Sequence, residues 1–253
     1  MAFDVAADSY TRFMGRYSEQ LAVRFADRLG VVPPADILDV GCGPGALTAV
    51  LVERLGAVAV HAVEPSASFH AAAQQRLPHV AIRRASAEDL PYDDDRFDGA
   101  LAQLVVHFMT DPVAGLREMA RVTRPGGIVA VNVWDYAGGR SPLSTFWRAA
   151  RELDAAAPTE SHLAGAREGH LEELLTAAGL RSVRGGDLEV AVPHPGFDDW
   201  WAPYLLGVGP AGDHVRGLDE ERRTELRERC RTLLPQGPFE VRAAAWCAVG
   251  VVP

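Results

Sequence analysis

The sequence predicts an α/β protein built on a mostly parallel sheet with helices on both faces. Through residue 135, short apolar runs of strand length alternate with segments whose apolar residues recur at helical spacing. A glycine-rich turn follows the first apolar run, as expected where a buried strand enters a helix. The length of 253 residues suits one such domain with insertions. Alternating strands and helices imply βαβ units, and therefore a parallel sheet covered on both sides.

The elements of the first half follow from these runs and their boundaries. Expected strands cover residues 36–40, 57–63, 80–84, 97–103 and 128–134, and expected helices cover residues 45–55, 66–76 and 111–122. Asp111 is an N-cap residue and Pro112 stands at the first helical position, a favoured pairing that starts the third helix. The turn TRPGG (123–127) is expected to end it.

The rhythm changes after Asp135. A loop at 137–142 precedes a helical stretch to about residue 153, and an amphipathic helix at 167–180 ends at Gly179. Residues 188–193 and 239–252 read as strands, with helical segments at 197–206 and 218–234 between them. We therefore expect one domain, residues 1–253. Its parts are a helical leader (1–30), a core (31–135) and helical insertions (136–180 and 194–237).

Composition narrows the class of protein. Apolar residues make up 48% and charged residues 23%, which excludes disorder for most of the chain. The net charge of -9, without a coherent basic patch, disfavours nucleic acid as a partner. The cysteines show no metal-ligand spacing, so no metal site is expected. The start of the chain lacks the pattern of a signal peptide, and no apolar run could span a membrane, so we expect a cytoplasmic protein. The oligomeric state stays open.

The segment DILDVGCGPGALT (36–48) carries the chemistry. Gly41 and Gly43 form a tight turn between strand and helix, where a Cβ would block positive φ and the close approach of a ligand. Glu64 ends the next strand about 20 residues later, where a carboxylate can accept both ribose hydroxyls. These features predict a nucleoside-containing cofactor at the carboxyl ends of the strands.

The glycine pattern alone leaves the cofactor open. It also satisfies the GxGxxG/A fingerprint of dinucleotide enzymes, so an NAD(P)-dependent oxidoreductase is one alternative. Asp39, just before the first glycine, argues against it, because its charge would repel a pyrophosphate and attract an ammonium group.

At this point the chain resembles the class I S-adenosylmethionine-dependent methyltransferases, in particular the small-molecule branch near the ubiquinone/menaquinone-biosynthesis type. The matching segments, in family order, are DILDVGCGPG, HAVEPS (61–66), residues 85–108 and residues 120–135. The resemblance implies a Rossmann-like fold with a mostly parallel seven-stranded sheet, helices on both faces and helical insertions late in the chain. It also implies that the leader is a lid and that the insertions cover the methyl acceptor.

The resemblance implies a role for particular residues. Asp39 lies near the amino group of the cofactor, Glu64 binds its ribose, and Gln103 faces its sulfonium. Ser86 stands where the family usually has an aspartate that reads the adenine, and Glu88 is a candidate to compensate. The full set implied for S-adenosylmethionine is Arg16, Asp39, Gly41, Gly43, Glu64, Pro65, Ser86, Ala87, Glu88 and Gln103.

The acceptor half of the site is less defined. His107 and Asp135 are the candidate proton acceptors, and a structural role for His107 is slightly favoured. Aromatic side chains in segments that the family uses to cover its acceptor form either a pocket wall or the core of a helical cap. They are Trp134, Trp147, Trp200, Trp201 and Tyr204.

The expected function is methyl transfer from S-adenosylmethionine to an oxygen, nitrogen or carbon atom of a small molecule, leaving S-adenosylhomocysteine. One alternative from another class stays open at this level. A protein that binds S-adenosylmethionine as a sensor, or that catalyses a different reaction such as cyclisation, would have the same cofactor half.

Overall fold

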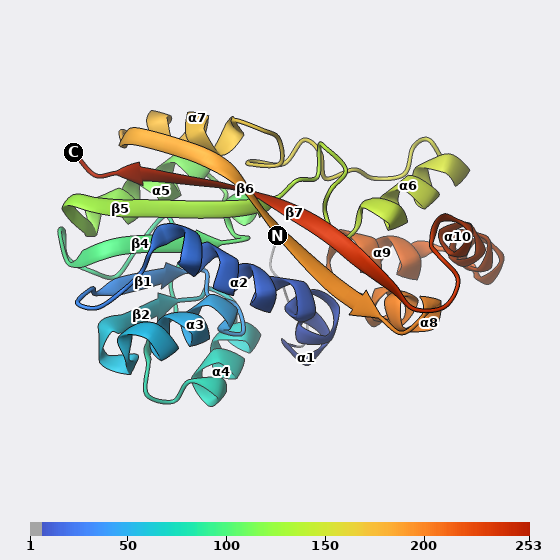
Figure 1. Ribbon diagram of the computed structural model, residues 1–253, viewed down its shortest axis with the longest axis horizontal. Helices are drawn as coiled ribbons and strands as arrows, with labels where there is room; N and C mark the ends of the chain where they lie inside the picture. The colour runs from blue at the N-terminus through green and yellow to red at the C-terminus, as the bar shows by residue number, and fades with distance from the viewer. Residues whose placement is uncertain (1–6) are drawn as a thin grey trace.

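A seven-stranded mixed sheet forms the centre of the molecule in the computed structural model, which describes residues 7–253 (Figure 1). The strands are β1 (Ile37–Val40), β2 (Val60–Val63), β3 (Ala81–Arg83), β4 (Phe97–Gln103), β5 (Thr123–Trp134), β6 (Arg181–His194) and β7 (Phe239–Val251). Their order is β3-β2-β1-β4-β5-β7-β6, and β7 runs antiparallel to both of its neighbours. The predicted fold class, a mostly parallel sheet of Rossmann-like methyltransferase type, is confirmed.

Helices cover both faces of this sheet. The leader contains α1 (Ala7–Tyr10), a π-helical turn (Thr11–Gly15) and α2 (Arg16–Leu29). Next come α3 (Ala46–Leu55), α4 (Ala67–Arg76), α5 (Pro112–Arg121) and α7 (His170–Ala177). Helices α2, α3 and α4 pack on one face, and α5 and α7 pack on the other. Asp111 caps α5 as predicted, because its side chain accepts a hydrogen bond from the amide of Ala114.

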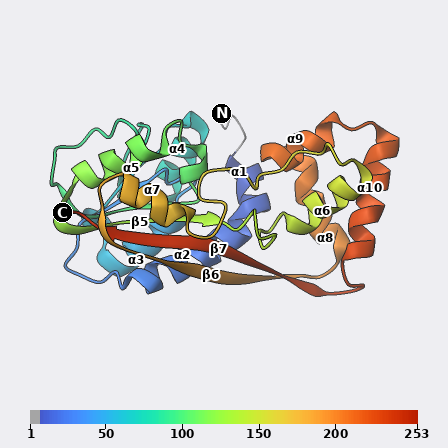
Figure 2. The same cartoon turned by 90° about the horizontal axis from the view of Figure 1, so that it is seen from above.

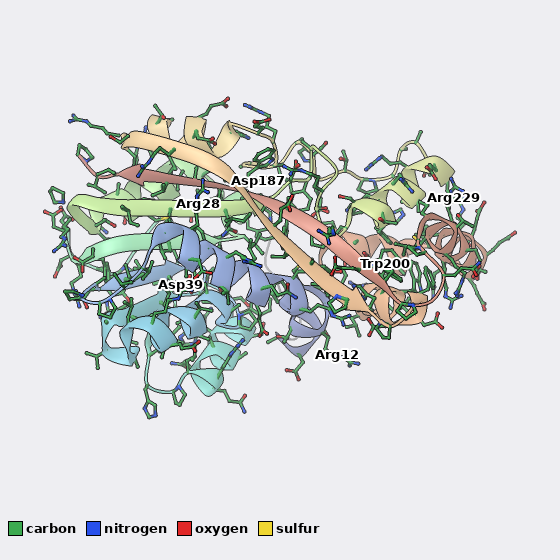
Figure 3. The ribbon with its side chains drawn as sticks, viewed as in Figure 1. Arg12, Arg28, Asp39, Asp187, Trp200 and Arg229 are labelled. Atoms are coloured by element: carbon green, nitrogen blue, oxygen red, sulfur yellow. The ribbon has the colours of Figure 1, made fainter. Side chains whose placement is uncertain are left out.

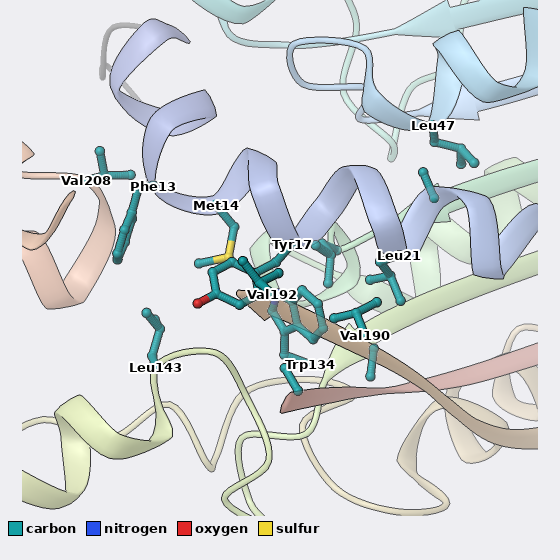
Figure 4. Packing of buried hydrophobic residues seen from close by; sticks show 14 of the residues in the cluster. Phe13, Met14, Tyr17, Leu21, Leu47, Trp134, Leu143, Val190, Val192 and Val208 are labelled. Atoms are coloured by element: carbon teal, nitrogen blue, oxygen red, sulfur yellow. The ribbon is translucent and has the colours of Figure 1, made fainter. Parts of the chain in front are cut away.

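The long hairpin of β6 and β7 runs beyond the sheet and carries a helical cap (Figure 2). The cap consists of α6 (Ser144–Leu153), α8 (Phe197–Trp201), a 3-10 turn (Ala202–Leu206), α9 (Gly209–Gly217) and α10 (Glu220–Leu233). One hydrophobic cluster joins it to the sheet, from Leu21 and Phe25 of α2 to Phe146 and Trp200 of the cap. The leader lies at this junction, where Phe13, Met14 and Tyr17 pack among β6 and cap residues (Figure 4).

Some predicted boundaries were wrong because strand pairing overrides local propensity. The turn predicted at residues 123–127 belongs to β5, since Thr123 pairs with Phe97 and the amide of Gly126 bonds to the carbonyl of Val252. Strand β6 begins at Arg181, well before the predicted 188, because β7 supplies a partner along its whole length. Helix α9 had not been predicted.

Candidate functional site

A cavity of about 420 Å³ lies at the carboxyl ends of β1, β2 and β4. Asp39 comes from β1, Glu64 directly follows β2, and Gln103 ends β4. Figure 3 shows Asp39 in the layer of parallel strands, away from the cap that holds Trp200. The lining residues are Tyr10, Ser18, Asp39, Gly41, Cys42, Gly43, Pro44, Ala46, Leu47, Glu64, Pro65, Ser66, Ala67, Phe69, Arg84, Gln103, Leu104, Val105 and Phe108.

The turn after β1 depends on its glycines. Gly41 has φ +69°, and a Cβ there would stand 2.7 Å from the side chain of Val105. Gly43 has φ +55°, and an added Cβ would meet no protein atom within 4 Å. The backbone at Gly43 therefore borders open space in the cavity, where a ligand can approach it closely.

Glu64 connects this turn to the start of α4. Its Oε2 accepts the amide of Gly43 at 2.9 Å, and its Oε1 accepts the amide of Ser66 at 2.8 Å. Burial raises the pKa of the carboxyl, against the lowering effect of these two amides. A carboxylate has about four lone-pair sites, so each oxygen keeps one for a ligand hydroxyl.

Asp39 is buried beneath the glycine turn. Its Oδ2 accepts the hydroxyl of Thr48 at 2.6 Å. Burial raises its pKa to about 7, and the charge of Glu64 adds to the rise. A cation in the cavity would favour the ionised form of Asp39, because opposite charges attract. The cavity should therefore bind a cationic group more strongly than a neutral one.

Gln103 presents an unpaired acceptor in the same cavity. Its Nε2 donates to the carbonyl of Ser18 in the leader at 3.0 Å, while its buried Oε1 has no hydrogen-bond partner among the described residues. A buried polar atom without a partner is costly, and a ligand donor would relieve that cost.

The structure does not bring all predicted cofactor residues to this cavity. Arg16 instead forms an ion pair with Asp199 of α8 at 2.8 Å. Ser86, Ala87 and Glu88 do not line the cavity, and Glu88 accepts the amide of Thr110 at 2.8 Å. Of the other residues predicted for the cofactor, Gly41, Gly43 and Pro65 do line this cavity.

A second cavity of about 40 Å³ shares Tyr10, Leu104 and Phe108 with the first. His107 and Trp134 line it. The remaining lining residues are Phe13, Met14, Tyr136, Leu143, Glu160, Val208, Gly209, Pro210 and Ala211. The two cavities therefore have a common wall.

The predicted catalytic pair is split by the fold. Burial lowers the pKa of His107 to about 3, so the imidazole is neutral at physiological pH, and its Nδ1 has no partner among the described residues. The Asp135 carboxylate instead accepts the amide of Gly138 and the guanidinium of Arg140, each at 2.7 Å. Asp135 lines neither of the two cavities.

The predicted aromatic residues also divide between cavity and cap. Trp134 borders the second cavity, whereas Trp200, Trp201 and Tyr204 pack against one another inside the cap, where Trp201 stacks on Tyr204 and Trp200 is tilted to both. Trp147 is buried and donates its indole N–H to Glu160 at 2.6 Å.

Sequence reasoning missed several residues of the two cavities. Two of them could have been found from the sequence: Phe108 ends a matched family segment, and Tyr10 lies in the leader that the resemblance identifies as a lid. Arg84 and Glu160 had no such signal, since only the packing of β3 against β2 and of the loop after α6 brings them to the cavities.

Two general features of the described residues bear on the class of protein. Within residues 7–253, no three His, Cys, Asp or Glu side chains are grouped so that they could hold a metal ion. Over the same range, no helix is both long enough and apolar enough to cross a bilayer.

Comparison with known proteins identifies the family. Residues 38–131 match the model described as a methyltransferase domain. The trans-aconitate 2-methyltransferase of Methylobacterium nodulans is 32% identical over 240 residues, and the match covers 87% of this chain and 86% of that protein. The malonyl-[acyl-carrier protein] O-methyltransferase of Pseudescherichia vulneris is 34% identical over 149 residues, 58% of this chain and 57% of that protein.

Solved structures agree on the fold. An S-adenosylmethionine-dependent methyltransferase from Thermotoga maritima has a TM-score of 0.55 at 19% identity, over 97% of this chain and 99% of its own. The geranyl diphosphate C-methyltransferase of Streptomyces coelicolor, solved with S-adenosylhomocysteine, has a TM-score of 0.54 at 17% identity. That match covers 94% of this chain and 80% of the other. With the glycine turn and Glu64 at the strand ends, these matches place the chain in the class I S-adenosylmethionine-dependent methyltransferases, with S-adenosylmethionine as its cofactor.

Proposed function

We propose that the protein transfers a methyl group to a small molecule whose reacting atom lies in the second cavity. The observation that carries this proposal is the wall common to the two cavities, formed by Tyr10, Leu104 and Phe108. Transfer by in-line displacement needs donor and acceptor side by side, with water excluded. Positioning of this kind supplies up to about 7–11 kcal/mol in well-oriented systems.

The residues of the larger cavity fit the cofactor. Its volume of about 420 Å³ lies in the usual range for small-molecule sites. In our proposal Asp39 binds the ammonium group, Glu64 accepts the ribose hydroxyls, and Gln103 turns its free Oε1 toward the donor end. Pro65 and Arg84 flank the adenine. The cofactor supplies a methyl group on a positively charged sulfur, which a lone pair of the acceptor can displace.

The two insertions cover the acceptor. Leu143 and Glu160 from the first insertion and the segment 208–211 from the second line the smaller cavity. His107 lines this cavity as a neutral imidazole, which can form a hydrogen bond with the methyl acceptor. Asp135 is not part of the proposed machinery, because Arg140 and a backbone amide engage its carboxylate.

The methyl acceptors named for the relatives do not suit the smaller cavity of this protein. trans-Aconitate bears several carboxylates, and a site for it needs cationic side chains to offset their desolvation. Neither lysine nor arginine is among the residues that line the smaller cavity.

Calorimetry with S-adenosylmethionine, S-adenosylhomocysteine and NAD tests the cofactor half. We expect saturable binding of the first two and none of NAD, and the reverse would refute the proposal. Incubation with a panel of small acceptors and mass detection of a product heavier by one methylene then tests the transfer. Binding of the cofactor with no methylated product from any acceptor would favour a sensor or a different reaction.

A further inference from the structure

Glu160 is a buried acid in the wall of the smaller cavity. The residue is 7% exposed. Its Oε2 accepts the indole N–H of Trp147 at 2.6 Å, and among the described residues its carboxylate forms no ion pair. Burial raises its pKa, and the Trp147 bond lowers it only in part. A carboxylate in such a place is unfavourable unless a cation or further donors reach it.

The described lining of the smaller cavity around Glu160 contains aromatic rings and no arginine. Tyr10, Phe13, Phe108, Trp134 and Tyr136 line the same cavity. All 25 basic residues of the chain are arginines, and none of them is in this lining. Arg151 borders a different small cavity that Glu160 also touches, but it does not pair with Glu160. Aromatic faces beside a carboxylate are the arrangement that attracts an ammonium group.

Two residues of the lining also carry hydrogen-bonding atoms that the fold leaves unused. Trp134 Nε1 and His107 Nδ1 are buried without a partner among the described residues. His107 is neutral, so Glu160 is the one charged group in the described lining. A carboxylate ligand would be repelled by Glu160, because this lining holds no cation. A protonated amine would instead form an ion pair with Glu160.

We propose that the methyl acceptor is a small amine, whose ammonium group binds to Glu160 between the aromatic side chains of the smaller cavity. This inference rests on the proposed function, because it assigns a substrate class to the same acceptor site. The cavity volume of about 40 Å³ admits the amino group and a few carbon atoms, so the reacting end of the acceptor is slender.

The transfer balances with Glu160 as proton acceptor. The bound ammonium gives one proton to the carboxylate and becomes a neutral amine. The nitrogen lone pair then forms the new N–C bond while the S–C bond breaks, and the electron pair of that bond stays on sulfur. The product leaves as a methylammonium ion, and Glu160 returns its proton to water.

The test measures binding directly and does not depend on turnover. Protein labelled with ¹⁵N at tryptophan is first saturated with S-adenosylhomocysteine, which checks the cofactor site separately. Propylamine, 1-propanol and propionate are then titrated in turn, and the indole N–H signals of the five tryptophans are followed. The signal of Trp134 is assigned from the Trp134→Phe spectrum.

We expect propylamine to shift the Trp134 signal saturably and at lower concentration than 1-propanol, and propionate to leave it in place. Glu160→Gln keeps an acceptor for the Trp147 indole and removes the charge, so it should weaken propylamine binding by about tenfold or more. Glu168→Gln removes the same charge from an exposed position and should change nothing.

The results that overturn the proposal are equally specific. They are no saturable shift with propylamine, equal or tighter binding of propionate or 1-propanol, or unchanged propylamine binding in folded Glu160→Gln protein. If this variant does not fold, the ligand series on the unmodified protein still decides between amine and anion. Failure of S-adenosylhomocysteine to bind at the start would instead refute the proposed function.

Discussion

Replacing Glu64 by alanine tests the cofactor site most directly, and the structure predicts two separate losses. The first is in stability, because the carboxylate accepts the amides of Gly43 and Ser66 at 2.9 and 2.8 Å in a site that is 5% exposed. At about 1.5–3 kcal/mol for each hydrogen bond to a charged acceptor, the free energy of unfolding should fall by up to about 3–6 kcal/mol, less the burial cost that the carboxylate no longer carries. The melting temperature should fall by about 2–4 °C for each kcal/mol.

The second loss is in cofactor affinity. Each charge-assisted bond to a ribose hydroxyl contributes about 1.5–3 kcal/mol, part of which water restores in the variant. The net loss should exceed about 1.4 kcal/mol, which corresponds to at least tenfold weaker binding. Calorimetry with S-adenosylhomocysteine measures it, below the melting temperature of the variant as recorded by circular dichroism.

The control is Glu53→Ala, which removes an exposed carboxylate from the neighbouring helix α3. It should leave both the affinity and the melting temperature within error of the unmodified protein. A folded Glu64→Ala protein with unchanged affinity would show that Glu64 only closes the turn, and our assignment of the ribose would be wrong.

Three further predictions concern the proton at Asp39, the buried His107 and the leader. Because the pKa of Asp39 is raised to about 7, S-adenosylhomocysteine should bind more weakly as the pH falls through 7 and should release a proton on binding near that pH. Calorimetry in buffers of different ionisation enthalpy measures this release, and Asp39→Asn should abolish it. The pKa of His107 is lowered to about 3 in the folded protein, whereas an unfolded histidine has a pKa of about 6.5. As the pH falls below about 6.5 the imidazole is protonated in the unfolded chain but not in the folded one. The free energy of unfolding should therefore decrease by up to about 1.4 kcal/mol for each pH unit. Urea unfolding at pH 7 and pH 5 should show a smaller loss for His107→Gln, and an equal loss would contradict the neutral burial of His107. Tyr10 lines the larger cavity, where we propose that the cofactor binds. S-adenosylhomocysteine should therefore slow tryptic cleavage at the exposed Arg12 but not at Arg229 of the cap. Equal cleavage rates at Arg12 with and without S-adenosylhomocysteine would mean that the leader is a packing element only.

The sequence by itself determined the sheet core and the glycine turn that lines the larger cavity. The backbone at positions 41 and 43 has positive φ, which favours glycine. Asp39 and Glu64 stand at the ends of β1 and β2, and the parallel pairing of these strands brings the two residues together. Such positions are set by short-range geometry, so a reader of the sequence can place them. The capping of α5 by Asp111 is predictable for the same reason.

Only the tertiary structure decided the rest of the site. Arg16 pairs with Asp199, which is 183 residues away. Arg140, which pairs with Asp135, is also held by Asp187 of β6, 47 residues away. Glu160 reaches the smaller cavity from a loop with no motif of its own. Whether a charged side chain serves a ligand or an ion pair depends on which partner the packing of distant segments delivers, and no local pattern records that choice.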